Sequence, residues 1–228
     1  MQEISSQLVL FGDFSSFTFQ YVETIFGELR KEFEMEISGV PDEIDQISPS
    51  PIVIQPHTST RPVLENKILG FRVLFLSKKI RIINGNPNNE KERERFEHLY
   101  TKIIEELYQL NLSIVRIGVN GALIVLSEDN VNKIYNTFFK TNDYSSESMF
   151  EWNFRINKRT NIALQNDKTV ITNNIISATT GFVNNAQKAL QINYDFNNVV
   201  SRDLAFSRDE CFMFIHKGIE FKNNIKNI

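Results

Sequence analysis

The stretch FEWNFRIN, residues 150–157, alternates strictly between apolar and polar side chains, which is the spacing of a β-strand with one buried face. QINYDF, residues 191–196, alternates in the same way. Between them, NIALQ (161–165) and KTVITNNIISA (168–178) flank a turn at Asn166-Asp167. We therefore predict a four-stranded antiparallel meander that buries one face and exposes the other to water.

Amphipathic helices accompany these strands. In four segments apolar side chains recur every three or four residues, which is the spacing of a helix with one buried stripe. The last segment begins with a capping box, Ser207-x-x-Glu210, and the tail that follows it, residues 221–228, is expected to fray. The helices are predicted from Asp13, Ser15 or Ser16 to about Gly39, from Asn88 or Asn89 to about Tyr108, from Ser127 to about Lys140, and from Ser207 to Gly218.

Two hairpins are predicted in the first half. FRVLFL (71–76) and IRII (80–83) are β-rich runs joined at Ser77-Lys78-Lys79. In LSIVRIGVNGALIVLS (112–127), Asn120-Gly121 separates two apolar runs, and this dipeptide favours a type I′ turn. Because hairpins dominate and regular βαβ alternation is missing, we predict an α+β fold with mainly antiparallel sheets and amphipathic helices packed on one face.

The chain divides by composition at a polar segment near residues 141–148. We expect an N-terminal α+β half, residues 1–140, and a C-terminal half of β-meander plus helix, residues 149–228. The two halves form either separate units or one compact domain, and no sequence self-similarity establishes a duplication.

The composition excludes several classes of protein. Of 228 residues, 41% are hydrophobic and 23% charged, which is typical of a folded chain. No apolar run approaches the roughly 20 residues that span a bilayer, and the N-terminus has no secretory pattern. A single cysteine excludes an intramolecular disulfide framework. We therefore expect a cytoplasmic protein with no membrane association.

One set of residues matches a catalytic spacing. Pro41-Asp42 followed by Glu65-Asn66-Lys67 has the PD…ExK order of a nuclease superfamily, in which two carboxylates hold Mg²⁺ and the lysine assists the attacking water. Asp42, however, lies in a proline-flanked loop, and such short patterns arise often by chance. Motifs for phosphate loops, zinc peptidases and nucleophilic serines are missing.

Charge is distributed unevenly. Residues 1–60 carry a net charge of −8, and residues 61–228 carry +5, which is too dilute for a nucleic-acid-binding surface. The acidic segment could steer a basic partner or a basic part of another copy. The outward face of the meander is a second polar surface, either a binding surface or a solvated face. The candidate binding residues are Glu28, Glu32, Glu34, Asn153, Arg155, Asn193 and Asp195.

Several local sequences match one bacterial family. Tyr100, Arg116-Ile117-Gly118, Ile192-Asn193-Tyr194-Asp195 and His216 stand in the order found in an uncharacterised, sporadically distributed bacterial protein family of about this length, which the chain resembles. The family's strand usually continues with an Arg-Tyr-like pair, whereas this chain has Val119-Asn120-Gly121. The resemblance implies no known activity. Sporadic distribution suits genes carried by mobile elements or defence islands, and the asparagine-rich composition is typical of an AT-rich bacterial or phage genome.

These observations favour a non-catalytic cytoplasmic interaction or assembly protein without a cofactor. Its expected partner is another protein or a second copy of itself rather than nucleic acid. The alternative is a Mg²⁺-dependent nuclease using Asp42, Glu65 and Lys67.

Overall fold

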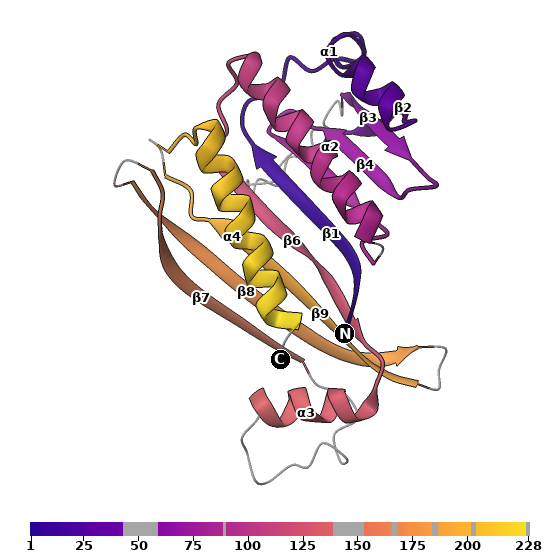
Figure 1. Cartoon of the computed structure of the whole chain (residues 1–228), viewed down its shortest axis with the longest axis vertical. Helices are drawn as coiled ribbons and strands as arrows, with labels where there is room; N and C mark the ends of the chain where they lie inside the picture. Colours follow the sequence, from indigo (N-terminus) through magenta and orange to yellow (C-terminus); the bar gives the residue numbers. More distant parts are fainter. Residues whose placement is uncertain are drawn as a thin grey trace, which may run out of the picture.

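Nine strands form one antiparallel sheet in the computed structural model, which describes residues 1–42, 59–88, 90–138, 153–165, 168–183, 187–201 and 204–226. Figure 1 shows this sheet, whose strands follow the order β2-β3-β4-β5-β1-β6-β9-β8-β7. The strands are β1 Gln2–Phe11, β2 Glu36–Pro41, β3 Thr60–Asn66, β4 Phe71–Phe75, β5 Lys79–Asn84, β6 Arg116–Val125, β7 Asn153–Ala163, β8 Thr169–Val183 and β9 Gln187–Asn198. The helices are α1 Phe19–Glu32, α2 Glu90–Gln109, α3 Glu128–Phe138 and α4 Arg208–Lys226.

The sheet has one face covered by helices, which confirms the predicted α+β class. One row of directly paired residues crosses six strands on this face, and all of its members are buried beneath α1, α2 and α4. The row consists of Leu64, Val73, Ile82, Leu8, Val119 and Phe196. Burial of this apolar row against the helices is the main source of stability for such a layered fold.

The order of elements repeats within the sheet. After β1 come a helix, the strands β3, β4 and β5, and then α2; after β6 come a helix, the strands β7, β8 and β9, and then α4. β1 and β6 pair at the centre, and the other strands extend outward on either side, with β2 added at one edge. The second unit of this repeat begins at β6, inside residues 1–140. Consequently, α2 and α4 flank the central strands (Figure 1).

The predicted hairpin at Asn120-Gly121 is wrong, because β6 runs straight through it. Asn120 pairs with Gln7 on one side and with Asp195 on the other. A type I′ turn needs positive φ at both central residues, and among the described residues only Glu34, Asn111 and Gly70 have positive φ. Gly121 has another role: a Cβ at this position would lie 2.3 Å from the Ser5 carbonyl oxygen and 2.6 Å from the Tyr194 hydroxyl.

Other predicted bounds need correction. The first helix ends at Glu32, not near Gly39, because residues 36–41 form the edge strand β2. The last helix continues past Gly218 to Lys226, so most of the tail is helical rather than frayed. β7 replaces two of the four predicted meander strands. The hairpin of β4 and β5 and the helix α2 are confirmed. From residue 43 onward, the proline-flanked loop predicted around Asp42 lies outside the described residues.

The capping box that starts α4 is confirmed. The Ser207 backbone N–H donates to Glu210 Oε2 at 2.8 Å, and the Glu210 backbone N–H donates to Ser207 Oγ at 3.3 Å. Lys168 Nζ also contacts Glu210 Oε2, at 2.9 Å, so the start of α4 is tied to the β7–β8 connection. These contacts fix the direction in which α4 crosses the sheet.

Candidate functional site

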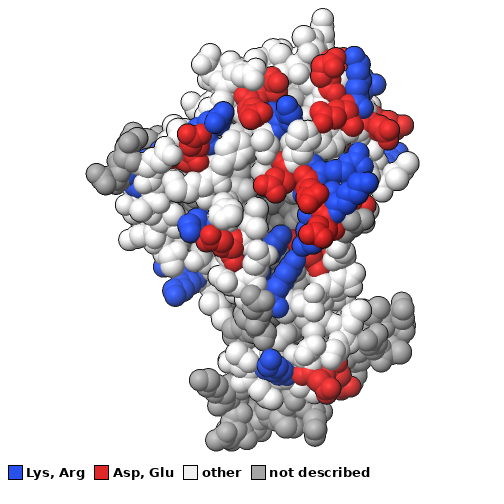
Figure 2. All heavy atoms as spheres, viewed as in Figure 1, with Lys and Arg blue, Asp and Glu red and all other residues white. Residues whose placement is uncertain are grey.

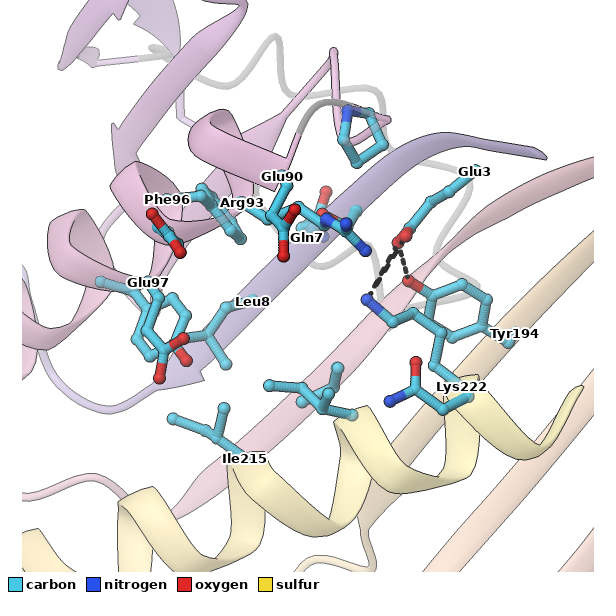
Figure 3. A pocket seen from close by; sticks show the side chains of 17 residues that line it. Glu3, Gln7, Leu8, Glu90, Arg93, Phe96, Glu97, Tyr194, Ile215 and Lys222 are labelled. Carbon is cyan, nitrogen blue, oxygen red and sulfur yellow. Dashed lines mark hydrogen bonds and ion pairs between the residues drawn. The ribbon is translucent and has the colours of Figure 1, made fainter. Parts of the chain in front are cut away.

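A cleft of about 320 Å³ opens between α2 and α4, above the central strands β1 and β6 (Figure 3). At one end the two helices are joined by Tyr108, whose hydroxyl donates to the Phe206 carbonyl at 2.7 Å and lies 3.2 Å from Cys211 Sγ. Toward the other end the helices leave room between them. The volume is at the lower end of the range of about 300–1,000 Å³ seen for small-molecule sites.

The floor and walls of the cleft are mixed in character. Apolar and aromatic side chains come from the sheet, α2 and α4, and charged side chains come from β1, α2 and the end of α4. Figure 2 shows acidic and basic side chains gathered on this face of the molecule, around the hollow beside α2. The lining includes Glu3, Leu8, Glu90, Arg93, Glu94, Glu97, Tyr100, Tyr194, Ile215, Ile219, Lys222 and Asn223.

Glu3 lies at the deep end of the cleft, where its side chain is 1% exposed. The Tyr194 hydroxyl donates to Glu3 Oε1 at 3.0 Å, and Lys226 Nζ donates to Oε2 at 2.8 Å. Lys222 Nζ is 3.3 Å from Oε1. A buried carboxylate is tolerated only when it is paired and hydrogen-bonded, and these three groups from β9 and α4 meet that requirement.

A β-bulge explains why Glu3 faces the helices. Ser5 pairs with Ala122, so a regular register would pair Glu3 with Ile124 on the face away from the helices. Instead, the register shifts by one residue between Glu3 and Ser5, and Glu3 pairs with Leu123, which is fully buried in the core. Bulges commonly re-aim a side chain in this way.

The environment perturbs the titration of two groups that contact Glu3. Burial raises the pKa of Tyr194, and the negative charge of Glu3 raises it further. Burial lowers the pKa of Lys222; Glu3 opposes this shift, whereas the positive charges of Lys226 and Arg93 add to it. Perturbed groups that converge on a cleft are typical of ligand sites, although structural ion-pair clusters perturb pKa values as well.

The structure brings four of the predicted binding residues together on the other face of the sheet. Arg155, Ser177 and Asn193 are directly opposite one another on β7, β8 and β9. Asn153 and Asp195 lie two residues away along their strands, on the same face. This surface, which we call the open face, points away from α2 and α4.

A polar ladder crosses the open face. Arg159 Nε donates to Asn173 Oδ1 at 3.3 Å, and Asn173 Nδ2 donates to Asn197 Oδ1 at 3.1 Å. Arg116 Nη2 donates to the same Asn197 oxygen at 3.2 Å, and its guanidinium stacks over the Phe11 ring at 4.8 Å. The ladder joins five strands, and two of its members are cations held by neutral amides.

The three predicted acidic residues lie at the opposite edge of the sheet, in and after α1. Glu28 is paired with Lys31 at 3.1 Å, and Glu32 lies 2.7 Å from His98 Nε2. Glu34 is exposed and takes a left-handed φ of 50° at the link between α1 and β2. They share one end of the molecule, but the structure does not place them in a cleft with the open-face residues.

Asp42, Glu65 and Lys67 do not form one cluster. Asp42 accepts from the Ser77 backbone N–H at 3.1 Å and lies 3.9 Å from Arg61 Nε. Its backbone N–H donates to the carbonyl of Ser59, which directly precedes β3 and lies six residues before Glu65, so the two carboxylates are roughly 20 Å apart in the direction of β3. Glu65 contacts Arg72 at 3.5 Å and Lys67 at 3.9 Å. Among the described residues no group of three or more His, Cys, Asp or Glu side chains is arranged to hold a metal ion.

The sequence matches no protein-family model and no curated protein. The family resemblance based on Tyr100, Arg116-Ile117-Gly118 and His216 therefore stays a prediction. In the part of the chain that the structure describes, every helix is too short or too polar to cross a membrane.

Proposed function

We propose that this protein is a non-catalytic binding protein, and that the cleft between α2 and α4 is its ligand site. The observation that carries this proposal is the combination of open volume and fixed polar groups above the centre of the sheet. Apolar side chains such as Leu8 and Ile219 offer a ligand a surface to cover, and the Glu3 cluster sets the polarity of one end.

The Glu3 cluster also has a structural role, because it ties the end of α4 to the start of β1. A purely structural ion-pair cluster, however, needs no space beside it. Tyr194, Lys222 and Lys226 are already engaged with Glu3, which favours binding over proton transfer as the purpose of the cleft.

The test is to fill the cleft. We expect 1-octanol, a neutral amphiphile, to shift the ¹H–¹⁵N resonances of residues around the cleft, and Ile219→Trp to abolish these shifts. Asn223→Trp, at the exposed rim, provides a second obstruction with little risk to folding. The control is Ile68→Trp, which adds the same ring at a position 88% exposed in the β3–β4 connection. Binding that survives in folded Ile219→Trp and Asn223→Trp proteins would contradict the proposal.

A second candidate function is self-association through the open face, with a second copy of this chain as the partner. Arg155, Arg159 and Arg116 have no ion pair with any acid among the residues described, although all three lie on this face. The acidic end at α1 of another copy, which carries Glu28 and Glu34, is complementary in charge. Because the two surfaces are different parts of the molecule, the contact would be head-to-tail.

Sedimentation at low salt tests this assembly. We expect concentration-dependent association that Arg155→Glu/Arg159→Glu and Glu28→Lys/Glu34→Lys each weaken, and that mixing the two variants restores, because the reversed charges are again complementary. The triple variant Glu28→Gln/Glu32→Gln/Glu34→Gln should also associate more slowly, and its association rate should depend less on salt. A monomer at every concentration would exclude the assembly.

A further inference from the structure

Three cations gather at the deep end of the cleft. Arg93 of α2, Lys222 and Lys226 lie around a single buried carboxylate, that of Glu3. Lys222 and Lys226 are paired with Glu3, whereas Arg93 has no ion pair within the described residues. Figure 3 shows Arg93 reaching from α2 toward Lys222 on the facing helix.

This arrangement leaves electrostatic repulsion that an anion would relieve. The Lys222 side chain is only 13% exposed, and its burial disfavours the protonated form most; Glu3 opposes this effect, whereas the charges of Lys226 and Arg93 add to it. An anion placed between Arg93 and Lys222 would accept hydrogen bonds from both cations, and charge-assisted hydrogen bonds are the strong ones. The guanidinium is well suited to a carboxylate, which it can bind with two parallel hydrogen bonds.

The remaining lining limits the charge and shape of the ligand. Glu90 and Glu94 flank Arg93 on α2, and Glu97 lines the cleft farther along the same helix. These carboxylates repel a ligand that carries several negative charges or a long anionic polymer. Leu8, Ile215 and Ile219, by contrast, form an apolar surface beside the cationic end. The helix rise of about 1.5 Å per residue places Ile215 about 10 Å from Lys222 along α4.

We infer that the cleft binds a small amphiphilic monoanion, an aliphatic or aromatic carboxylate, with its head group between Arg93 and Lys222 and its apolar body over Leu8, Ile215 and Ile219. This inference rests on the proposed function of the cleft as a ligand site. It assigns Arg93 and Lys222 as the residues that select the charge of the ligand.

Three probes with the same alkyl chain separate the charge preference from the existence of the site. Octanoate, 1-octanol and octylammonium are titrated into the full chain, with affinity measured by calorimetry and position by ¹H–¹⁵N shifts. We expect octanoate to bind at least tenfold more tightly than 1-octanol, and octylammonium to bind most weakly. Octyl phosphate, which carries more charge near neutral pH, should bind more weakly than octanoate because of Glu90 and Glu94.

Variants on α2 locate the head group. Arg93 is exposed, so Arg93→Gln should fold normally; we expect it to weaken octanoate binding about tenfold and to leave 1-octanol binding unchanged. Arg93→Lys should restore part of the loss. The matched control is Lys102→Gln, which removes one positive charge from the same helix at an exposed position outside the cleft.

The outcomes distinguish the charge preference of the cleft from its existence as a ligand site. Equal or tighter binding of octylammonium would overturn the assignment of a monoanion while leaving the cleft as a ligand site. Octanoate binding that Arg93→Gln does not weaken would overturn the placement of the head group. If neither octanoate, 1-octanol nor octylammonium shifts resonances around the cleft, the proposed ligand site fails, and this inference fails with it.

Discussion

Replacing Glu3 by glutamine should lower the free energy of unfolding by about 2–3 kcal/mol. The glutamine amide keeps the volume of the side chain and an oxygen that can still accept from the Tyr194 hydroxyl. It removes the only carboxylate that contacts Lys222 and Lys226 within the described chain. The substitution therefore isolates the loss of charge pairing.

The magnitude follows from the exposure of the two lysines. Removing one partner of a fully buried ion pair costs about 3–5 kcal/mol, because the other charge is left without compensation. Lys222 is 13% exposed and Lys226 is 24% exposed, so both ammonium groups can recover part of their hydration by turning toward solvent. The expected loss is accordingly below that range, yet well above the value of a surface pair, which is about 0–1 kcal/mol.

Urea unfolding monitored by circular dichroism measures the effect, provided that the slope of free energy against urea is unchanged. The matched control is Glu28→Gln, whose side chain is 94% exposed; it should change the free energy of unfolding by less than about 0.5 kcal/mol. A loss for Glu3→Gln as small as that of the control would refute the conclusion that Glu3 holds α4 to β1.

Three further measurements test the packing and the buried groups. Gly218→Ala should destabilise the protein by about 1–2 kcal/mol in urea unfolding, because its Cβ would lie 2.7 Å from Val119. Gly27→Ala on α1, where a Cβ would meet no neighbouring group within 4 Å, should stabilise the protein by about 0.5–1 kcal/mol. The same sign for both variants would contradict the helix–sheet contact at Gly218. Burial raises the pKa of Cys211 to about 12, so a disulfide reagent at pH 8 should label the folded protein only as fast as it unfolds, and rapid labelling would show an accessible thiol. Because burial lowers the pKa of Lys222, the folded state releases that proton at a lower pH than the unfolded state does. The free energy of unfolding of the wild type, relative to that of Lys222→Met, should therefore rise with pH between the lowered pKa and about 10.4. A difference in free energy that does not change with pH would contradict the lowered pKa.

Features encoded in contiguous residues were predictable from the sequence. The periodic apolar stripe of α2, the capping box at Ser207 and Glu210, and the hairpin of β4 and β5 each depend on a few neighbouring residues. The alternation in residues 191–196 correctly placed Tyr194 on the buried face and Asn193 on the other. The fold class follows from these local signals.

Features that depend on distant contacts were not predictable. Asn120-Gly121 is a turn signal by composition, yet the glycine is needed because Ser5 and Tyr194 come too close for a side chain. Gly218 reads as the end of a helix, yet it lies inside α4, where Val119 leaves no room for a Cβ. In both cases the same property of glycine, its missing side chain, serves close packing rather than chain reversal.

The cleft residues were missed for a related reason. Glu3 enters the site only because a bulge shifts its register by one residue. Lys222 and Lys226 fall in a tail that the sequence predicts to fray, although their spacing of four residues puts them on one face of a helix. That spacing, next to the apolar Phe221 and Ile225, is the one signal in the sequence that could have extended α4 over the sheet.

The position of the cleft is a consequence of the repeated topology. Each unit supplies one long helix that packs over its own strands, α2 over the β1 side and α4 over β6 and β9. The two helices therefore lie on either side of the central strands, on the same face of the sheet, and the space between them above β1 and β6 stays open. Glu3 on the first strand of the first unit can meet Lys222 on the last helix of the second only at this junction. A ligand in the cleft would contact both units at once. Its binding should therefore stabilise the packing of the two units against each other, in addition to each unit itself.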